Sequence, residues 1–187
     1  MKQSIDHIIK ESTKQNRSAQ KDLYDYTYQS LASIISLYVK DNSERDWVFN
    51  LGMLRIYTCL SSFAIGTNYD GWARTILVRA AIDYIRSNTK NKVTLVAIDN
   101  AHEQIVNDGV DDLLNQLEVD DLTKMIQALP ENERLVFTLF EIEGYGHKEI
   151  ESLTSINQNT SKWLLTKART SLKQMVECTF KITKSKK

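Results

Sequence analysis

Apolar residues recur along the first half of this chain every three or four positions, the spacing that places side chains on one face of an α-helix. Two such runs come before residue 60. Their apolar positions are Leu23, Tyr24, Tyr28, Leu31, Ile34, Ile35, Tyr38, Val48, Leu51, Leu54 and Ile56. A third run predicts a long helix from Gly71 to about Arg86, with Asp70 as its N-cap. Its predicted buried ridge is Trp72, Ile76, Ala80 and Tyr84.

A segment bracketed by helix-breaking residues opens the pattern of the second half. Pro130 and Gly144 flank residues 131–143, where the apolar side chains fall on one helical face. Those side chains are Leu135, Val136, Leu139 and Phe140. The pattern predicts a buried helix that supports the elements after it.

Two further helices and a tight connection follow. A short helix is predicted from His147 to about Thr154, and a longer one from Gln158 to about Val176. Asn157, in the connection between them, is suited to cap the longer helix. The buried stripe predicted for the longer helix is Leu164, Ala168, Leu172 and Met175. This layout predicts a helix-turn-helix.

Polar and cationic residues occupy another face of the longer helix. In a helix that enters a DNA major groove, polar residues of the first turn reach base edges and later cations meet the phosphate backbone. The candidate DNA-binding residues here are Gln158, Asn159, Thr160, Ser161, Lys162, Thr166, Arg169 and Lys173. Taken alone, this run fits a solvated surface helix equally well. The adjoining turn and short helix favour DNA binding.

Composition favours an all-α protein, because the 187 residues include one proline and six glycines. Cys59 and Cys178 belong to no paired motif, and the three histidines are scattered. The sequence therefore predicts no catalytic residue, no metal, no cofactor and no small-molecule substrate. Neither a signal peptide nor an apolar run of membrane-spanning length is found, so we expect a cytoplasmic protein.

Charge is unevenly distributed although the 24 basic and 24 acidic residues cancel. Acids dominate residues 91–121, whereas Lys and Arg dominate residues 159–187. A neutral total is therefore compatible with nucleic-acid binding by the basic part. We predict a first helical domain over residues 1–92, an acidic linker over 93–121, a second helical domain over 122–178 and a basic tail over 179–187.

A glycine-bearing loop, residues 62–69, precedes the helix predicted from Gly71 and has aromatic residues near both ends. Aromatic and arginine side chains beside such a loop suit the capture of unstacked bases. The candidate residues are Tyr69, Arg74, Arg79 and Arg86. Asp83 is spaced for ion pairs with Arg79 and Arg86, so a salt-bridged solvent face is an alternative interpretation.

These motifs resemble the bacterial sigma factors of the extracytoplasmic-function (ECF) type, which keep only the helical domains called region 2 and region 4. The resemblance extends from Ser18 to about Val176 and leaves out only the acidic linker. Its most specific stretches are Tyr69-Asp70-Gly71-Trp72, Ala81-Ile82-Asp83-Tyr84-Ile85-Arg86 and Glu143-Gly144-Tyr145-Gly146-His147-Lys148-Glu149-Ile150. The last of these looks most like the versions found in Bacteroidota.

The resemblance implies core RNA polymerase and promoter DNA as partners, an anti-sigma factor as a further partner, and no enzymatic activity. The loop 62–69 and the following helix would open and read the minus-ten element, and the helix-turn-helix would bind the minus-thirty-five element. The residues that would dock on polymerase are Asp46, Trp47, Asn50, Met53, Leu54, Arg55 and Tyr57.

Several positions depart from the family pattern. The polymerase-facing run lacks two acids and has Gly52 in mid-helix, at a cost of about 1 kcal/mol. Arg79 and Glu151 stand where asparagine and alanine are usual. Ser155 replaces a turn glycine, which a negative φ would permit. Two alternatives stay open: a divergent sigma-like interaction protein without promoter activity, and a helix-turn-helix regulator whose N-terminal helices dimerise.

Overall fold

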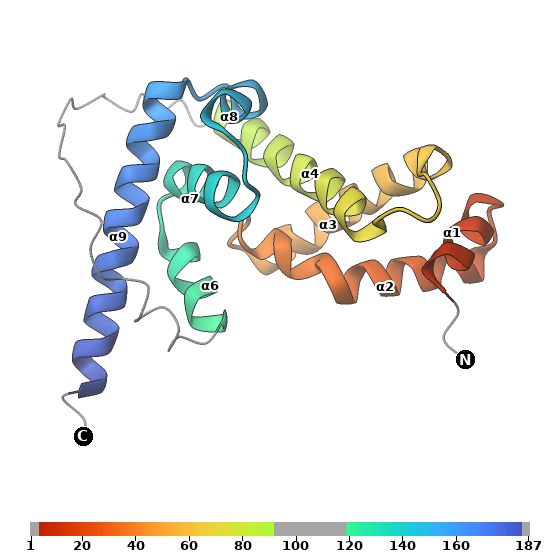
Figure 1. Cartoon of the computed structure of the whole chain (residues 1–187), viewed down its shortest axis with the longest axis horizontal. Helices are drawn as coiled ribbons and strands as arrows, with labels where there is room; N and C mark the ends of the chain where they lie inside the picture. The colour runs from red at the N-terminus through yellow and green to blue at the C-terminus, as the bar shows by residue number, and fades with distance from the viewer. Residues whose placement is uncertain (1–3, 92–118, 185–187) are drawn as a thin grey trace. The chain divides into compact units, whose positions relative to one another are not determined.

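The computed structural model describes residues 4–91 and 119–184, and these ranges consist of helices and their connecting turns (Figure 1). The all-α fold predicted from composition is confirmed over this part of the chain. Two compact units are present, Met1–Asn88 and Thr89–Lys187. Most of the predicted acidic linker and the end of the predicted basic tail lie outside the described residues.

The first unit contains α1 (Ile5–Thr13), α2 (Arg17–Ser36), α3 (Asn42–Cys59), a 3₁₀ turn η1 (Leu60–Ser62) and α4 (Tyr69–Asn91). Polar side chains cap the N-termini of these helices. Asn16 Oδ1 accepts from the amides of Ser18 and Ala19 at the start of α2. Asn68 Oδ1 accepts from the Gly71 amide at 3.1 Å, so Asn68 and not Asp70 caps α4. The predicted cap was therefore wrong by two positions.

The buried face of α4 also differs from the predicted ridge. Its buried apolar residues are Tyr69, Ala73, Leu77, Val78, Ala80, Ala81, Ile82 and Ile85. The predicted ridge took every fourth residue, and each such step turns about 40° around a helix. Trp72 and Tyr84 therefore lie about 120° apart, and both are only half-buried. Ala80 alone of the predicted ridge is fully buried.

Gly52 lets α3 come close to α4. A Cβ atom at this position would lie 2.5 Å from Leu77 Cδ2, far inside van der Waals contact. Leu77 is fully buried, so its side chain has little room to move. The glycine that lowers the helix propensity of α3 is thus required by packing.

The second unit contains α6 (Val119–Ala128), α7 (Glu131–Phe137), a π-helical turn η2 (Thr138–Ile142), α8 (His147–Thr154) and α9 (Gln158–Lys184). The predicted bounds of α8 are confirmed, and α9 continues past the predicted end at Val176. Residues 119–121, predicted to end the linker, form the first turn of α6. In Figure 1, α9 is the longest helix of this unit, with α6, α7 and α8 along it.

The core of the second unit joins the stripe of α9 to α7 and α8. Its buried members include Leu135, Val136, Leu139, Ile150, Leu164, Leu165, Ala168, Leu172 and Val176. Phe140, predicted on the buried face, is only half-buried. Its ring stacks on His147 with the two centroids 4.7 Å apart.

The connection between α8 and α9 contains a strained residue. Ser155 has φ +65°, in the left-handed region, so the negative φ that would accommodate a serine at this turn without strain is not adopted. The Ser155 amide donates to Glu151 O at 2.9 Å, and the Thr160 amide donates to Asn157 Oδ1 at 2.9 Å. These bonds satisfy the helix ends and fix the turn, and the second confirms Asn157 as the cap of α9.

Candidate nucleic-acid interface

The first turns of α9 present most of the predicted DNA-binding side chains to solvent. Gln158, Asn159, Lys162 and Arg169 are exposed, whereas Thr160, Thr166 and Lys173 are half-buried. The apolar stripe of the same helix faces the core, so the polar face is available to a ligand. This arrangement is that of a helix-turn-helix with an open recognition helix.

Ser161 is the exception, because its side chain is fully buried. Its Oγ lies 2.9 Å from His147 Nδ1, at the start of α8. The prediction that Ser161 faces base edges is therefore wrong in this conformation, and its hydroxyl joins α8 to α9. Burial, followed by the nearby Lys162 and Arg169, lowers the pKa of His147. A neutral imidazole therefore makes this contact at neutral pH.

Arg169 is already engaged within the unit. Its Nε donates to Glu141 Oε1 at 2.8 Å, and its guanidinium lies 5.9 Å from the centre of the Phe140 ring. Because Arg169 is about half exposed, this ion pair contributes little free energy. Arg169 can exchange Glu141 for a phosphate at small cost.

Gln158, the first residue of α9, is held by α8. Its Nε2 donates a 2.7 Å hydrogen bond to Glu151 Oε2 across the turn. In the sequence, Glu151 stands out only as a departure from the family pattern. Glu151 and Gln158 lie seven residues apart on either side of a turn, so helical spacing does not predict their hydrogen bond.

Tyr69, the predicted DNA-binding residue at the end of the loop before α4, is not exposed. Tyr69 is 3% exposed, and its hydroxyl lies 2.7 Å from Thr27 Oγ1. Burial raises the pKa of Tyr69 above its ordinary value. Its ring packs on Phe63 and Trp72 with centroids 5.8 and 6.0 Å away. The prediction that Tyr69 is available to DNA is corrected: this residue belongs to the core.

Ile65 is the large apolar side chain that the loop exposes, at 43%. Nothing in the sequence distinguishes it as exposed. From the sequence alone, an isoleucine between an alanine and a glycine cannot be distinguished from a buried core residue. Its exposure depends on the conformation of the loop. Gly66, which follows it, has φ +88° with open space around it.

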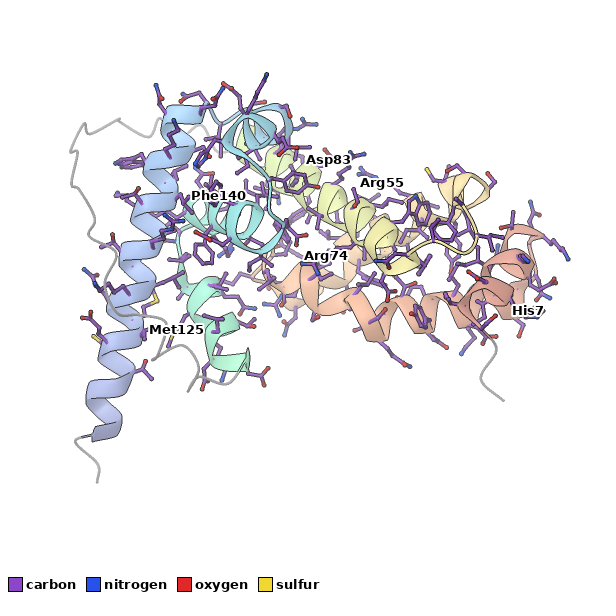
Figure 2. The ribbon with its side chains drawn as sticks, in the orientation of Figure 1. His7, Arg55, Arg74, Asp83, Met125 and Phe140 are labelled. Carbon is purple, nitrogen blue, oxygen red and sulfur yellow. The ribbon has the colours of Figure 1, made fainter. Side chains whose placement is uncertain are left out.

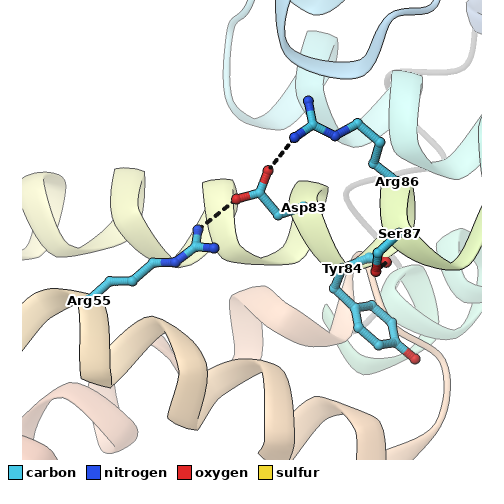
Figure 3. Close-up of polar contacts among 5 residues, drawn as sticks. All are labelled: Arg55, Asp83, Tyr84, Arg86 and Ser87. Atoms are coloured by element: carbon cyan, nitrogen blue, oxygen red, sulfur yellow. Dashed lines mark hydrogen bonds and ion pairs between the residues drawn. The ribbon is translucent and has the colours of Figure 1, made fainter.

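The arginines of α4 have different surroundings. Asp83 Oδ2 accepts from Arg55 at 2.8 Å and Asp83 Oδ1 accepts from Arg86 at 3.2 Å (Figure 3). The predicted Asp83–Arg86 pair is confirmed, whereas Arg55 of α3 takes the place predicted for Arg79. Arg79 is exposed and forms no ion pair with any described residue. Arg74, labelled in Figure 2, is half-buried.

The candidate polymerase-binding residues of α3 divide into exposed and packed groups. Asp46 and Asn50 are exposed, and the exposed fractions of Trp47 and Leu54 are 55% and 63%. Met53 is 2% exposed and therefore a core residue, which corrects its prediction as a docking residue. The other two fasten α3 in place. These are Arg55, through Asp83, and Tyr57, whose hydroxyl donates to Gln20 O at 2.6 Å.

Neither a membrane-spanning helix nor a metal cluster adds to these surfaces. None of the helices that the structure describes is both long and apolar enough to cross a membrane. Within the same residues, His, Cys, Asp and Glu form no group of three or more that could hold a metal ion.

Both units match known families. The family model for Sigma-70 region 2 matches residues 23–91, and that for Sigma-70, region 4 matches residues 119–172. The chain is 26% identical over 160 residues to RNA polymerase sigma factor SigZ of Bacillus subtilis (strain 168), spanning 84% of this chain and 86% of that protein. It is 24% identical over 184 residues to the ECF RNA polymerase sigma-E factor of Escherichia coli (strain K12), spanning 94% and 96%.

The comparison with solved structures also gave a match. It is the complex of the sigma factor RpoE with the anti-sigma factor NepR from Bartonella quintana. The match has a TM-score of 0.49 and 16% identity, and it covers 84% of this chain and 96% of that chain.

The two region models occur in order and together span most of the described residues, so the chain belongs to the sigma-70 family of RNA polymerase sigma factors. Its relatives along nearly the whole length place it among the ECF sigma factors. It is an alternative sigma factor, which binds core RNA polymerase and recognises promoters. The family predicted from the motifs is thereby confirmed.

Proposed function

We propose that the exposed face of α3 docks on core RNA polymerase. Asp46, Trp47, Asn50 and Leu54 recur at helical spacing, so they form one continuous surface. Trp47 and Leu54 are among the most exposed large apolar side chains of the described residues, which suits them to burial against a partner. Arg55, through its ion pair with Asp83, and Tyr57, through its hydrogen bond to Gln20 O, hold α3 in place. Met53 acts only through the core.

The helix-turn-helix of the second unit binds the minus-thirty-five element in this proposal. The observation that carries it is the exposed first turn of α9, which continues into Lys162 and Arg169 on the same polar side. Gln158 and Asn159 are placed for base edges, and the two cations for phosphates. Thr166 and Lys173 extend the phosphate contacts along the helix, and Thr160 supports the cap.

Region 2 opens and reads the minus-ten element in this proposal. The candidates are the exposed Arg79 and Arg86, the half-buried Arg74, and Ile65 on the loop. Unstacking a base costs a few kcal/mol, which contacts to the freed base and backbone must offset. Tyr69 supports the loop from within the core.

The remaining parts of the proposal follow from the family. The chain supplies no catalytic residue of its own and acts beside polymerase in the cytoplasm. The two units work as separate domains, with residues 1–92 as region 2 and residues 122–178 as region 4. An anti-sigma factor is a further partner in this proposal.

Reconstituted transcription tests the proposal. The purified chain is mixed with core RNA polymerase from a bacterium that encodes it, and bound promoters are recovered from fragmented genomic DNA and transcribed. We expect co-elution with core enzyme and transcription from a specific promoter set. Trp47→Ala and Leu54→Ala should lose co-elution, whereas Ser30→Ala, an exposed change on α2, should retain it.

The two alternatives give different results in this experiment. Co-elution without any transcript would indicate a sigma-like interaction protein. Sequence-specific duplex binding by the chain alone, with no co-elution, would indicate a helix-turn-helix regulator. Either result would overturn the proposed function.

A further inference from the structure

Glu151 occupies an unfavourable position for its own helix. It lies in the last turn of α8, where a carboxylate faces the negative end of the helix dipole. Its Oε2 accepts the 2.7 Å hydrogen bond from Gln158 Nε2, at the positive end of α9. The carboxylate is therefore stabilised by α9 and not by α8. This placement couples Glu151 to the residue that begins the recognition helix.

The contact determines which way the Gln158 amide faces. A carboxylate only accepts hydrogen bonds, so the nitrogen of the amide must point to Glu151. An unrestrained glutamine can turn either its oxygen or its nitrogen toward DNA. With one N–H held by Glu151, Gln158 offers its Oε1 and its second N–H to other partners.

An acceptor beside a donor matches one base in the major groove. Adenine presents the N6 amino donor next to the N7 acceptor, and glutamine reads this pair with two hydrogen bonds. Guanine presents two acceptors, N7 and O6, so its O6 would face Gln158 Oε1. A Gln158 amide held in this orientation therefore favours adenine over guanine. An amide free to rotate would discriminate less between the two bases.

We propose that Glu151 is a positioning residue that makes Gln158 a reader of adenine in the minus-thirty-five element. The inference rests on the proposed promoter binding by α9. It assigns a role to Glu151, which touches no DNA base itself. It also predicts two separable effects, because the negative charge of Glu151 near phosphates weakens binding to every sequence alike.

The test uses the full chain reconstituted with core RNA polymerase and a duplex library randomised across the minus-thirty-five element. Bound duplexes are sequenced, and the preference for each base pair is calculated. Wild type should show one position with an adenine preference over guanine of about 5- to 150-fold, and Gln158→Ala should lose it. Glu151→Ala should reduce the same preference by about 5-fold or more, at that position alone.

Glu151→Gln is the matched control. It removes the same charge as Glu151→Ala but retains an oxygen that accepts from Gln158 Nε2. We expect it to keep the adenine preference, while both variants bind all duplexes more tightly than wild type. Because the side chains are at the surface, both variants should keep the wild-type circular dichroism spectrum.

Three outcomes would overturn the inference. In the first, Glu151→Ala keeps the full adenine preference; in the second, Glu151→Gln loses it to the same extent as Glu151→Ala. Both leave the proposed function intact, because wild type still selects a sequence. In the third, the wild-type holoenzyme selects no sequence at all, which removes the proposed function and this inference together.

Discussion

Replacement of Tyr69 separates a structural role from direct DNA contact. The ring is 3% exposed, and loss of a buried aromatic side chain costs about 3 to 5 kcal/mol. A unit of this size has a total stability of about 4 to 13 kcal/mol. We therefore expect Tyr69→Ala to remove much of the stability of the first unit. It should lose polymerase docking and promoter opening together.

Changes to the Tyr69 hydroxyl and its partner Thr27 test the same assignment with smaller, more specific effects. Thr27 Oγ1 donates to Leu23 O at 2.7 Å, so the Tyr69 hydroxyl must donate to Thr27. Tyr69→Phe removes this bond and should cost about 0.5 to 1.5 kcal/mol. Thr27→Val strands a buried phenol and should cost about 1 to 3 kcal/mol. The double variant should cost less than the sum, because neither partner is then left unpaired.

Urea unfolding measures these changes. Tryptophan fluorescence in a Trp163→Phe background reports on the first unit alone, through Trp47 and Trp72. A Tyr69→Ala variant that loses under about 1 kcal/mol but cannot open promoters would refute the core assignment. In that case Tyr69 would have to leave the core and act on DNA directly.

Three further predictions concern the DNA surfaces and the turn. Lys162→Ala should lower the slope of log affinity against log salt by about one unit, measured by fluorescence anisotropy of holoenzyme on a promoter duplex. An unchanged slope would remove Lys162 from the phosphate contacts. Arg79→Ala should form the closed complex but open the promoter poorly, with rescue by a pre-melted template; permanganate footprinting checks this, and normal opening on intact duplex would contradict it. Because the pKa of His147 is lowered, its contribution to stability is complete above about pH 6.5 and is lost as pH falls through its folded pKa. A His147→Phe variant should lose less of its unfolding free energy on acidification than wild type does, and equal losses would contradict this cause.

Local signals predicted the second unit well. Gly146 and Asn157 sit at the starts of α8 and α9, and their backbone and side-chain preferences alone specify a helix start. Helical spacing likewise predicted Leu164, Ala168 and Leu172, which are buried. Met175, the last residue of the predicted stripe, is only half-buried, and its neighbour Val176 is buried instead.

What could not be predicted depends on neighbours distant in sequence. Tyr69 and Ser161 each carry a hydroxyl that satisfies a partner on another helix, Thr27 or His147, and such pairing turns a polar side chain inward. The pairing of Asp83 with Arg55, and not with the predicted Arg79, also depends on a residue of another helix. Spacing within one helix cannot indicate a competing cation on the next helix.

The close approach at Gly52 has a consequence for how this sequence can change over time. The space beside Gly52 is filled by Leu77, so a larger residue at position 52 needs a smaller one at position 77. Substitutions at the two positions should therefore appear together among descendants of this chain. Gly52→Ala alone should destabilise the first unit, because the added methyl group clashes with Leu77. The double variant Gly52→Ala, Leu77→Val should lose less stability, so the two positions are expected to change together.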